Sequence, residues 1–202
     1  MFITIEGIEG VGKSTVVKFI EEYLLNKKLK FIGTREPGGT EIAEKIRSIL
    51  LATNKKEPLL PKTELLLMYA SRVQHIEYVI KPALETGRWV ICDRFNDASF
   101  AYQGGGRKLD IEKIESLDSW LVDIKPDITF LLDAPSEIGL SRAKNRGPQD
   151  RIELEKKEFF DCVRNMYLKR ADVYKERYKI INAANALEDV QLEIKNILDS
   201  LV

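Results

Sequence analysis

The fold is decided by residues 7–14, which read Gly7-Ile8-Glu9-Gly10-Val11-Gly12-Lys13-Ser14. The stretch fits G-x-x-x-x-G-K-S/T and lies where that motif requires, between an apolar run and an amphipathic helix. Glycines let consecutive backbone N–H groups close around phosphate oxygens, and the start of the helix adds its positive dipole end. We therefore predict a nucleotide phosphate site made by Gly7, Glu9, Gly10, Val11, Gly12, Lys13, Ser14 and Thr15.

Three side chains of this loop differ in the roles expected of them. Lys13 is expected to reach the outer phosphates, and Ser14 is expected to bind a magnesium ion. Glu9, by contrast, places a carboxylate inside an anion-binding loop. The phosphate site alone does not explain that acid.

The composition is that of an ordinary soluble chain. With 202 residues, 44% of them hydrophobic and 32% charged, the chain is long enough for one core, so we predict a single domain over 1–202. Basic and acidic residues number 32 each, so no overall field favours nucleic acid or an anionic membrane. We predict no nucleic-acid partner and no membrane association.

The cysteines and the N-terminus indicate the compartment. Cys92 and Cys162 are far apart without metal-ligand spacing, and a chain of this size needs no disulfide. The start of the chain lacks the pattern of a secretory signal, and no apolar run approaches about 18 residues. We therefore predict a cytoplasmic protein.

Short apolar runs alternate with helical patterns along the chain. Strands are predicted at 2–6, 30–34, 88–93, 128–132 and 178–182. Helices are predicted after the loop at 7–14, after 35–40, at 63–85, at 111–122, at 136–145, after 152 and at 187–201. This alternation predicts an α/β, P-loop type, three-layer fold, with a parallel sheet of about five strands between helices and a lid segment.

Some local predictions are more specific. The long helical pattern at 63–85 is expected to kink at Pro82 and to end at Gly87. Asp110 is the expected N-cap of the next helix, and the segment from Arg94 through Gly106 is predicted to be a loop. The helix after 35–40 is expected to bury one stripe and to carry Arg47 on its other side; that stripe is Ile42, Ile46, Ile49 and Leu50.

Polar side chains follow directly on the predicted strands. Arg35, Asp93 with Arg94, and Asp133 each stand at the end of a strand, as the loop at 7–14 does. Because the carboxyl ends of parallel strands share one edge, we expect these groups to gather there. An acid at the end of a central strand beside a phosphate loop suits a magnesium-water site, so Ser14 and Asp93 are the predicted metal residues.

A phosphate loop occurs in switches, motors and kinases, so its partners decide the chemistry. Residues 54–57 read Asn-Lys-Lys-Glu and resemble the guanine motif N-K-x-D, but they follow a helix and end in glutamate. We interpret that match as coincidental. A kinase needs two anionic substrates in line, with cations around the transferred group. The chain offers separated cations for both sides, which are Arg35, Arg47, Arg72 and Arg94 for an acceptor and Arg142, Lys144, Arg146 and Arg151 around a predicted mobile lid at about 142–152.

No side chain stands out as a general base. His75 lies within a helix, where we expect a satisfied or exposed residue. A hydroxyl acceptor usually needs a base, whereas a phosphate monoester, with a second pKa of about 6, is largely dianionic at pH 7 and can attack unaided. The inventory of residues therefore favours a nucleoside monophosphate kinase.

Several motifs together resemble the thymidylate (dTMP) kinase family, of the bacterial type with lid arginines. They span nearly the whole chain and are residues 6–14, Thr34-Arg35-Glu36-Pro37-Gly38-Gly39-Thr40, Asp93-Arg94-Phe95, Ala101-Tyr102-Gln103-Gly104-Gly105-Gly106-Arg107 and Asp150-Arg151-Ile152-Glu153. The resemblance implies transfer from Mg-ATP to dTMP, giving dTDP for dTTP synthesis, and a homodimer.

The resemblance also assigns the acceptor side. It implies that Glu9 accepts a hydrogen bond from the sugar 3′-hydroxyl and that Arg94, with Arg35 and Arg47, clamps the monophosphate. Tyr102 matches the tyrosine whose ring crowds a ribose 2′-hydroxyl. The remaining implied dTMP contacts are Glu36, Pro37, Met68, Arg72, Ser99 and Gln103, with Arg72 on the thymine edge.

On the donor side the resemblance implies a lid that carries catalytic arginines. The catalytic residues are then Lys13, Arg94, Arg146 and Arg151. The loop after the last strand corresponds to the adenine site. The implied adenine contacts are Asn182, Ala183, Ala184 and Arg142, the last by stacking on the base.

One residue departs from the family pattern. Met68 stands where the family usually has a phenylalanine that stacks on thymine, and a thioether covers a ring with less defined geometry. Another pyrimidine monophosphate kinase therefore stays open as an alternative. A non-catalytic nucleotide switch also stays open, although the acceptor arginines and the lid disfavour it. The balanced charge and the lack of a basic stripe with aromatics disfavour a nucleic-acid-binding ATPase.

Overall fold

The computed structural model describes residues 1–53, 56–144 and 149–202, and it contains a five-stranded parallel sheet. The strands run in the order β2-β3-β1-β4-β5, and each neighbouring pair is parallel. Their bounds are β1 Phe2–Glu6, β2 Phe31–Arg35, β3 Trp89–Asp93, β4 Ile128–Asp133 and β5 Tyr178–Asn182. The predicted fold class is confirmed, and each predicted strand agrees within one residue at either end.

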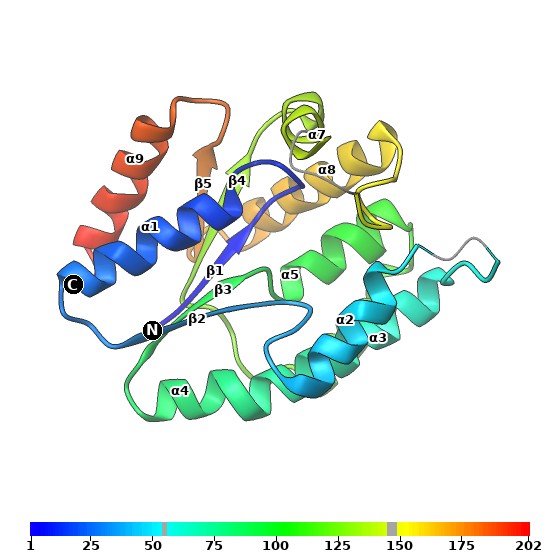
Figure 1. Cartoon of the computed structure of the whole chain (residues 1–202), viewed down its shortest axis with the longest axis horizontal. Coiled ribbons are helices and arrows are strands. Elements are labelled where there is room, and N and C mark those ends of the chain that lie inside the picture. Colours follow the sequence, from blue (N-terminus) through cyan, green and yellow to red (C-terminus); the bar gives the residue numbers. More distant parts are fainter. Residues whose placement is uncertain (54–55, 145–148) are drawn as a thin grey trace.

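Helices cover both faces of this sheet (Figure 1). In the picture α1 and α9 lie together on one side, and α2, α3 and α4 lie on the other. The helices of the described chain are α1 Lys13–Asn26, α2 Glu41–Leu51, α3 Pro61–His75, the π-helix η1 Ile76–Ile80, α4 Lys81–Glu85, α5 Asn96–Ser99, the π-helix η2 Phe100–Gly106, α6 Ile111–Leu121, α7 Ser136–Lys144, α8 Lys157–Val173 and α9 Leu187–Asp199. Among these helices there is no apolar stretch of the length that a bilayer crossing requires.

The hydrophobic core lies on both faces of the sheet, because the strands are apolar on both faces. Ile3 and Ile5 of β1 belong to a large cluster with α1 and α9, to which Ile20 and Ile194 contribute. Phe2 belongs instead to a second cluster with η1 and α4. Successive strand residues point to opposite faces, so β1 needs cover on both sides, as a parallel sheet between helical layers provides.

The predicted helix at 63–85 forms as three joined segments, α3, η1 and α4. Pro82 has no N–H to donate and its ring crowds the carbonyl four residues earlier. The helical turn just before Pro82 contains one extra residue, because the Lys81 N–H donates to the carbonyl of Ile76, five residues earlier, as in a π-helix. Gly87, at φ 70°, follows the end of α4 and stops the helical run as expected. Asp110 caps α6 by accepting from the Glu112 N–H at 3.0 Å, also as expected.

The predicted loop from Arg94 through Gly106 is wrong, because most of it is helical. α5 and η2 occupy this stretch, and η2 packs along α8. A Cβ on Gly105 would stand 2.8 Å from the Cys162 carbonyl oxygen, and one on Gly106 would meet the Phe159 ring. The glycines therefore serve a close helix–helix approach and not a turn.

The predicted inner face of α2 is partly wrong. Leu50 is fully buried as predicted, and Ile46 is half-buried. Ile42 and Ile49, however, are 52% and 54% exposed, and Ala43, which lies outside the predicted stripe, is fully buried. Arg47 is one helical turn from both buried residues, so it lies on the inner side and not the outer one. The sequence pattern allowed two overlapping stripes on this helix, and packing against α3 selects the one with Ala43.

Candidate active site

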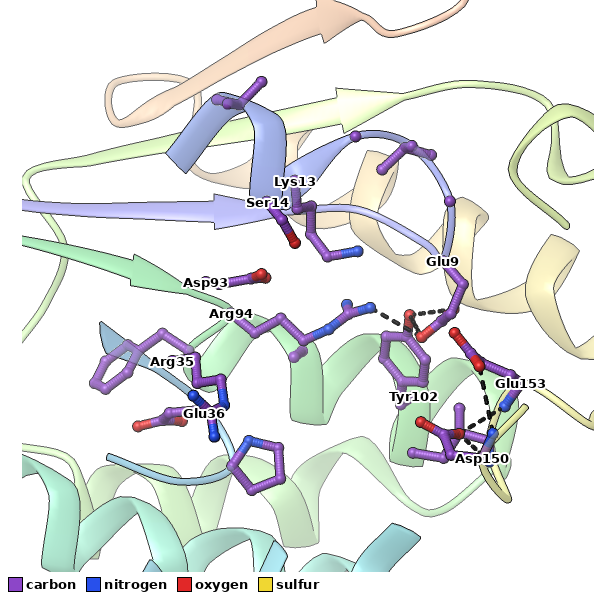
Figure 2. A pocket seen from close by; sticks show the side chains of 18 of the residues that line it. Glu9, Lys13, Ser14, Arg35, Glu36, Asp93, Arg94, Tyr102, Asp150 and Glu153 are labelled. Atoms are coloured by element: carbon purple, nitrogen blue, oxygen red, sulfur yellow. Dashed lines mark hydrogen bonds and ion pairs between the residues drawn. The ribbon is translucent and has the colours of Figure 1, made fainter. Parts of the chain in front are cut away.

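A large cavity opens at the carboxyl edge of the sheet, where the predicted polar groups gather. It has a volume of about 620 Å³. The loop between β1 and α1 forms one wall, and residues that follow β2 and β3 form the opposite one (Figure 2). Of the predicted site residues, the cavity is lined by Glu9, Gly10, Val11, Gly12, Lys13, Ser14, Thr15, Arg35, Glu36, Pro37, Arg47, Met68, Arg72, Asp93, Arg94, Ser99, Tyr102, Gln103, Arg142 and Ala183.

The loop at 7–12 has the backbone of an anion cradle. Gly12 precedes α1 with φ 96°, a left-handed value that favours glycine, and no side chain caps the helix there. Lys13 Nζ donates to the carbonyls of Gly7 at 3.2 Å and Ile8 at 2.7 Å. Burial, together with the charge of Arg94, lowers the pKa of Lys13 to about 8. Anionic oxygens in the cradle would oppose both effects and hold Lys13 charged.

Asp93 is suited to an outer-sphere or direct contact with a hard cation. Its Oδ1 is buried and finds no hydrogen-bond partner within 1–53, 56–144 and 149–202. Figure 2 shows its carboxylate across from Ser14 and Lys13. Those same ranges contain no cluster of three metal-ligating acids, histidines or cysteines. A magnesium ion, which keeps several waters and takes most other ligands from phosphates, needs no such cluster.

Glu9 is held at the cavity wall by two donors. Arg94 Nη2 donates to Glu9 Oε1 at 2.9 Å, and the Tyr102 hydroxyl lies 2.8 Å from both carboxylate oxygens (Figure 2). Arg94 also donates to the Gly7 carbonyl at 2.7 Å, and its guanidinium lies over the Tyr102 ring. Burial alone would lower the pKa of Arg94, but Tyr102 and Glu9 outweigh it and raise that pKa.

Three guanidinium groups share the acceptor side of the cavity. Arg35 pairs with Glu44 at 2.9 Å, and Arg47 Nη1 donates to the Pro37 carbonyl at 2.8 Å. Burial lowers the pKa of Arg47, and the charges of Arg35 and Arg94 lower it further. Cations that repel one another around an open cavity are stabilised by a bound anion, and a dianion would satisfy all three.

Arg72 lines the cavity from a buried position. It is 1% exposed, and its guanidinium donates to Glu36 at 2.7 Å, Ser99 at 3.0 Å and the Phe95 carbonyl at 3.0 Å. Burial would lower its pKa, but Glu36 outweighs that effect and raises it. Met68, one helical turn earlier on α3, lines the cavity. The site can therefore hold a flat ring against a thioether with a fixed cation at its edge.

Some predicted residues lie elsewhere. Gly7 does not line the main cavity, and its carbonyl accepts hydrogen bonds from Lys13 and Arg94. Asn182 and Ala184 line a smaller second cavity. Arg151 does not line the main cavity and donates to Glu64 at 2.7 Å and to the Leu50 carbonyl at 2.9 Å. Arg146 lies outside the described residues, as do two residues of the guanine-like segment, 54–55. Lys144 ends α7.

The predicted donor-side arginine has a defined contact. Arg142 Nη1 donates to the Ala183 carbonyl at 3.0 Å, which ties α7 to the loop after β5. Sequence reasoning missed several residues of the cavity wall, most of them apolar and embedded in predicted elements, where nothing distinguishes a wall from a core. They are Val16, Leu51, Phe95, Ala98, Asp150, Ile152, Glu153, Asn185, Leu187 and Val190.

His75 is a buried, satisfied residue, one of the two outcomes expected for it. Its Nδ1 lies 3.0 Å from Glu36 Oε1, and its Nε2 lies 2.7 Å from the Thr34 hydroxyl. It does not line the cavity. Its place is to hold Glu36, which in turn holds Arg72.

Comparison with known proteins gives a consistent result. The family model described as "Thymidylate kinase" matches residues 5–194. The chain is 52% identical over 201 residues to a thymidylate kinase of Ruthia magnifica, with 99% of this chain and 98% of that protein covered. It is 50% identical over 202 residues to one of Acinetobacter baylyi, with both chains covered completely. The crystal structure of a thymidylate kinase from Ehrlichia chaffeensis superposes with a TM-score of 0.80 at 33% identity, covering 98% of each chain.

Proposed function

Because the chain belongs to the thymidylate kinase family, we propose that its large cavity is the site where dTMP is phosphorylated to dTDP with ATP as the donor. One observation carries the placement of this reaction: Arg35 lies across the cavity from the phosphate loop, and Arg47 and Arg94 line the same cavity. Two anions can therefore meet end to end between the two walls.

The step itself needs few protein groups. An oxygen of the dTMP phosphate attacks the γ-phosphorus of ATP, and the bond from that phosphorus to the β–γ bridging oxygen breaks, which releases ADP. The attacking oxygen carries no proton at pH 7, so the step requires no general base. In this proposal Lys13 and Arg94 stabilise charge on the transferring group while the backbone N–H groups of the loop hold the donor.

Magnesium fits the residues of this site. Ser14 Oγ and the unpartnered Oδ1 of Asp93 are the groups that would hold it or its waters. When bound, the ion neutralises phosphate charge on the donor. The protein's own part is to keep the Asp93 carboxylate fixed at the end of β3, since the Asp93 carbonyl accepts from the Glu36 N–H at 2.9 Å.

The acceptor nucleoside is bound by the opposite wall. Glu9 accepts a hydrogen bond from the 3′-hydroxyl of dTMP in addition to its hydrogen bonds from Arg94 and Tyr102. Tyr102, buried at 4% exposure, places its ring where a 2′-hydroxyl would stand, and Arg72 donates to the base edge. Glu36 and Pro37 complete the phosphate side, and Ser99 and Gln103 the base side.

The lid carries the remaining proposed roles. We place Arg146 and Arg151 at the transferring phosphate in the closed state and Arg142 against adenine, with Asn182, Ala183 and Ala184 beside it. Arg151 is bonded to Glu64, so its catalytic role requires that ion pair to open. Residues 1–202 are proposed to act as one domain, with the lid at about 142–152.

We also propose a cytoplasmic homodimer. Two free thiols, Cys92 and Cys162, support a reducing compartment. Ile42 and Ile49 of α2 and Leu66 of α3 are more than half exposed on two helices that pack together, which supports an apolar contact between subunits. Leu65 and Tyr69, by contrast, are buried within one chain.

A substrate panel tests the proposed function. Purified protein with Mg-ATP is assayed for ADP release against dTMP, CMP, UMP and GMP in turn. We expect kcat/KM for dTMP to exceed the others strongly, because Arg72 and Tyr102 act on base and sugar. Equal or better turnover of CMP or UMP would instead support the wider pyrimidine kinase that Met68 leaves open.

A further inference from the structure

Arg94 has a backbone conformation that residues with a side chain rarely adopt. Its φ is 69°, in the left-handed region, where any residue other than glycine is strained. From the end of β3 its guanidinium reaches toward Glu9 and the phosphate loop (Figure 2). A strained residue persists only where its surroundings fix it from several sides. The groups that fix Arg94 therefore bear on how it meets a substrate.

Glu6, the last residue of β1, holds the backbone just after Arg94. It is fully buried, and its Oε1 accepts from the Phe95 N–H at 2.7 Å. The Arg94 N–H donates to the Ile5 carbonyl at 3.0 Å, and the Arg94 carbonyl accepts from the Cys92 thiol at 2.9 Å. When Glu6 is ionised, its bond is the strongest of the three, because a charged acceptor strengthens a hydrogen bond.

Glu6 also reaches the Arg94 side chain, through Tyr167 of α8. The Tyr167 hydroxyl donates to Glu6 Oε2 at 2.6 Å, and its oxygen accepts from Arg94 Nη1 at 3.2 Å. A hydroxyl has one proton, so a proton committed to Glu6 leaves the lone pairs of the oxygen for Arg94. Because Tyr167 is only 1% exposed, water does not compete for these bonds. Glu6 thus fixes both the backbone and the guanidinium of Arg94.

The fold gains no stability from having an acid at this position. Burial and the charge of Asp97 raise the pKa of Glu6 to about 7, and the charge of Arg94 does not offset them. Asp97 is paired with Arg170 and Arg177, so those two guanidinium groups are already engaged. An acid that burial disfavours, placed where it grips a cavity-lining arginine twice, is typical of residues kept for activity at the expense of stability.

We propose that Glu6 is a positioning residue for phosphoryl transfer: it holds Arg94 by its backbone and, through Tyr167, by its guanidinium, so that the positive charge meets the reacting phosphates already in place. Preorganised charge of this kind stabilises a transition state without rearrangement. The inference rests on the proposed function of the cavity. Neither Glu6 nor Tyr167 lines that cavity, so both act on the substrates only through Arg94.

The test measures kcat, KM for dTMP and Kd for Mg-ATP in the full chain and in Glu6→Gln, Glu6→Met and Tyr167→Phe. Glutamine keeps an acceptor for the Phe95 N–H but turns an NH2 toward Tyr167, whereas methionine accepts from neither. We expect kcat to fall about tenfold in Glu6→Gln and in Tyr167→Phe, the effect of one hydrogen bond, and about a hundredfold in Glu6→Met. KM should change less than kcat, and Kd for Mg-ATP should stay the same.

Stability provides the readout that separates positioning from packing. A purely structural residue loses stability and activity together when it is replaced. Glu6→Gln is instead expected to unfold at a higher urea concentration than the natural chain at pH 8 while its kcat falls.

Two results would overturn the proposal. The first is a natural kcat in Glu6→Met or, if that variant does not fold, in Tyr167→Phe. The second is a further tenfold loss when Glu6→Gln is added to Arg94→Met, because a residue that acts through a guanidinium has no effect once that group is gone.

Two matched controls are expected to keep the natural kcat. Tyr178→Phe removes another buried hydroxyl, one that has no hydrogen-bond partner among the described residues. Asp127→Asn changes an acid that accepts from the Phe2 N–H at 2.6 Å, at the other end of β1. A loss in either control as large as in its matched variant would also overturn the proposal. A natural chain without dTMP kinase activity would refute the proposed function, whereas an active chain whose kcat none of the three variants lowers would refute this inference alone.

Discussion

Arg94 Nη2 donates to Glu9 Oε1 at 2.9 Å, so the acid of the phosphate loop is paired with the arginine that follows β3. The pair joins the wall of the donor to the wall of the acceptor. It explains why a carboxylate can stand in an anion-binding loop: the acid faces Arg94 and Tyr102 and not the cradle of N–H groups.

Replacing Glu9 by glutamine should weaken the binding of dTMP much more than the binding of ATP. The amide keeps the size of the side chain but loses the charge that accepts strongly from a hydroxyl, a loss of roughly 1–3 kcal/mol. We expect the Kd of dTMP to rise about tenfold or more and the Kd of Mg-ATP to change little, both measured by calorimetry. An equal loss for both ligands would return Glu9 to a structural role in the loop.

Stability should depend on pH through Glu6, a fully buried acid at the end of β1. Burial, with the charge of Asp97, raises the pKa of Glu6 from 4.5 to about 7, although the Tyr167 hydroxyl and the Phe95 N–H donate to it. Since its folded pKa lies above its unfolded value, the stabilising effect of its neutral form is complete below pH 4.5 and is lost as pH rises to 7.

Glu6→Gln removes that dependence. The variant should therefore gain stability relative to the natural chain between pH 5 and pH 8, by roughly 2–3 kcal/mol in the free energy of unfolding. Urea unfolding at both pH values measures the difference. A gain or loss that is the same at pH 5 and pH 8 would show that Glu6 titrates alike in the folded and unfolded chain.

Gly105 should not tolerate a side chain. Its Cβ would stand 2.8 Å from the Cys162 backbone oxygen and from Met166, so η2 would have to move off α8. We expect Gly105→Ala to lower the free energy of unfolding by about 1–3 kcal/mol. Gly33→Ala is the matched control, because only the mobile carboxylate of Glu21 stands in its way. Equal costs for both variants would contradict the close approach of the two helices.

The sequence was most informative where one residue pattern allows one structure. The five strands are short continuous apolar runs, and each lies within one residue of its predicted ends. Because the carboxyl ends of parallel strands share one edge, the sequence also predicts that Arg35, Asp93 and Arg94 lie there, and all three line the cavity at that edge. Asp133 shares that edge but pairs with Arg164 beside the smaller cavity.

What the sequence could not show depends on packing between distant segments. On α2 an isoleucine stripe and an alanine–leucine stripe overlap, and only contact with α3 selects between them. The glycines at 104–106 are typical of a turn until α8 lies against them. Glu64 is one acid among 32 in the sequence, and its partners come from two other segments: Gln103 and Arg107 from η2 and its C-cap, and Arg151 from the segment before α8.

The central claim, that the arginine wall binds the phosphate acceptor, is tested most directly by kcat/KM for dTMP in Arg94→Met. We expect it to fall about a thousandfold or more, because Arg94 acts on the charge of the reacting phosphates, while Mg-ATP still raises the melting temperature. Arg164→Met, which removes a guanidinium from the same sheet edge outside the main cavity, should keep full activity. A wild-type value of kcat/KM in Arg94→Met would contradict the account.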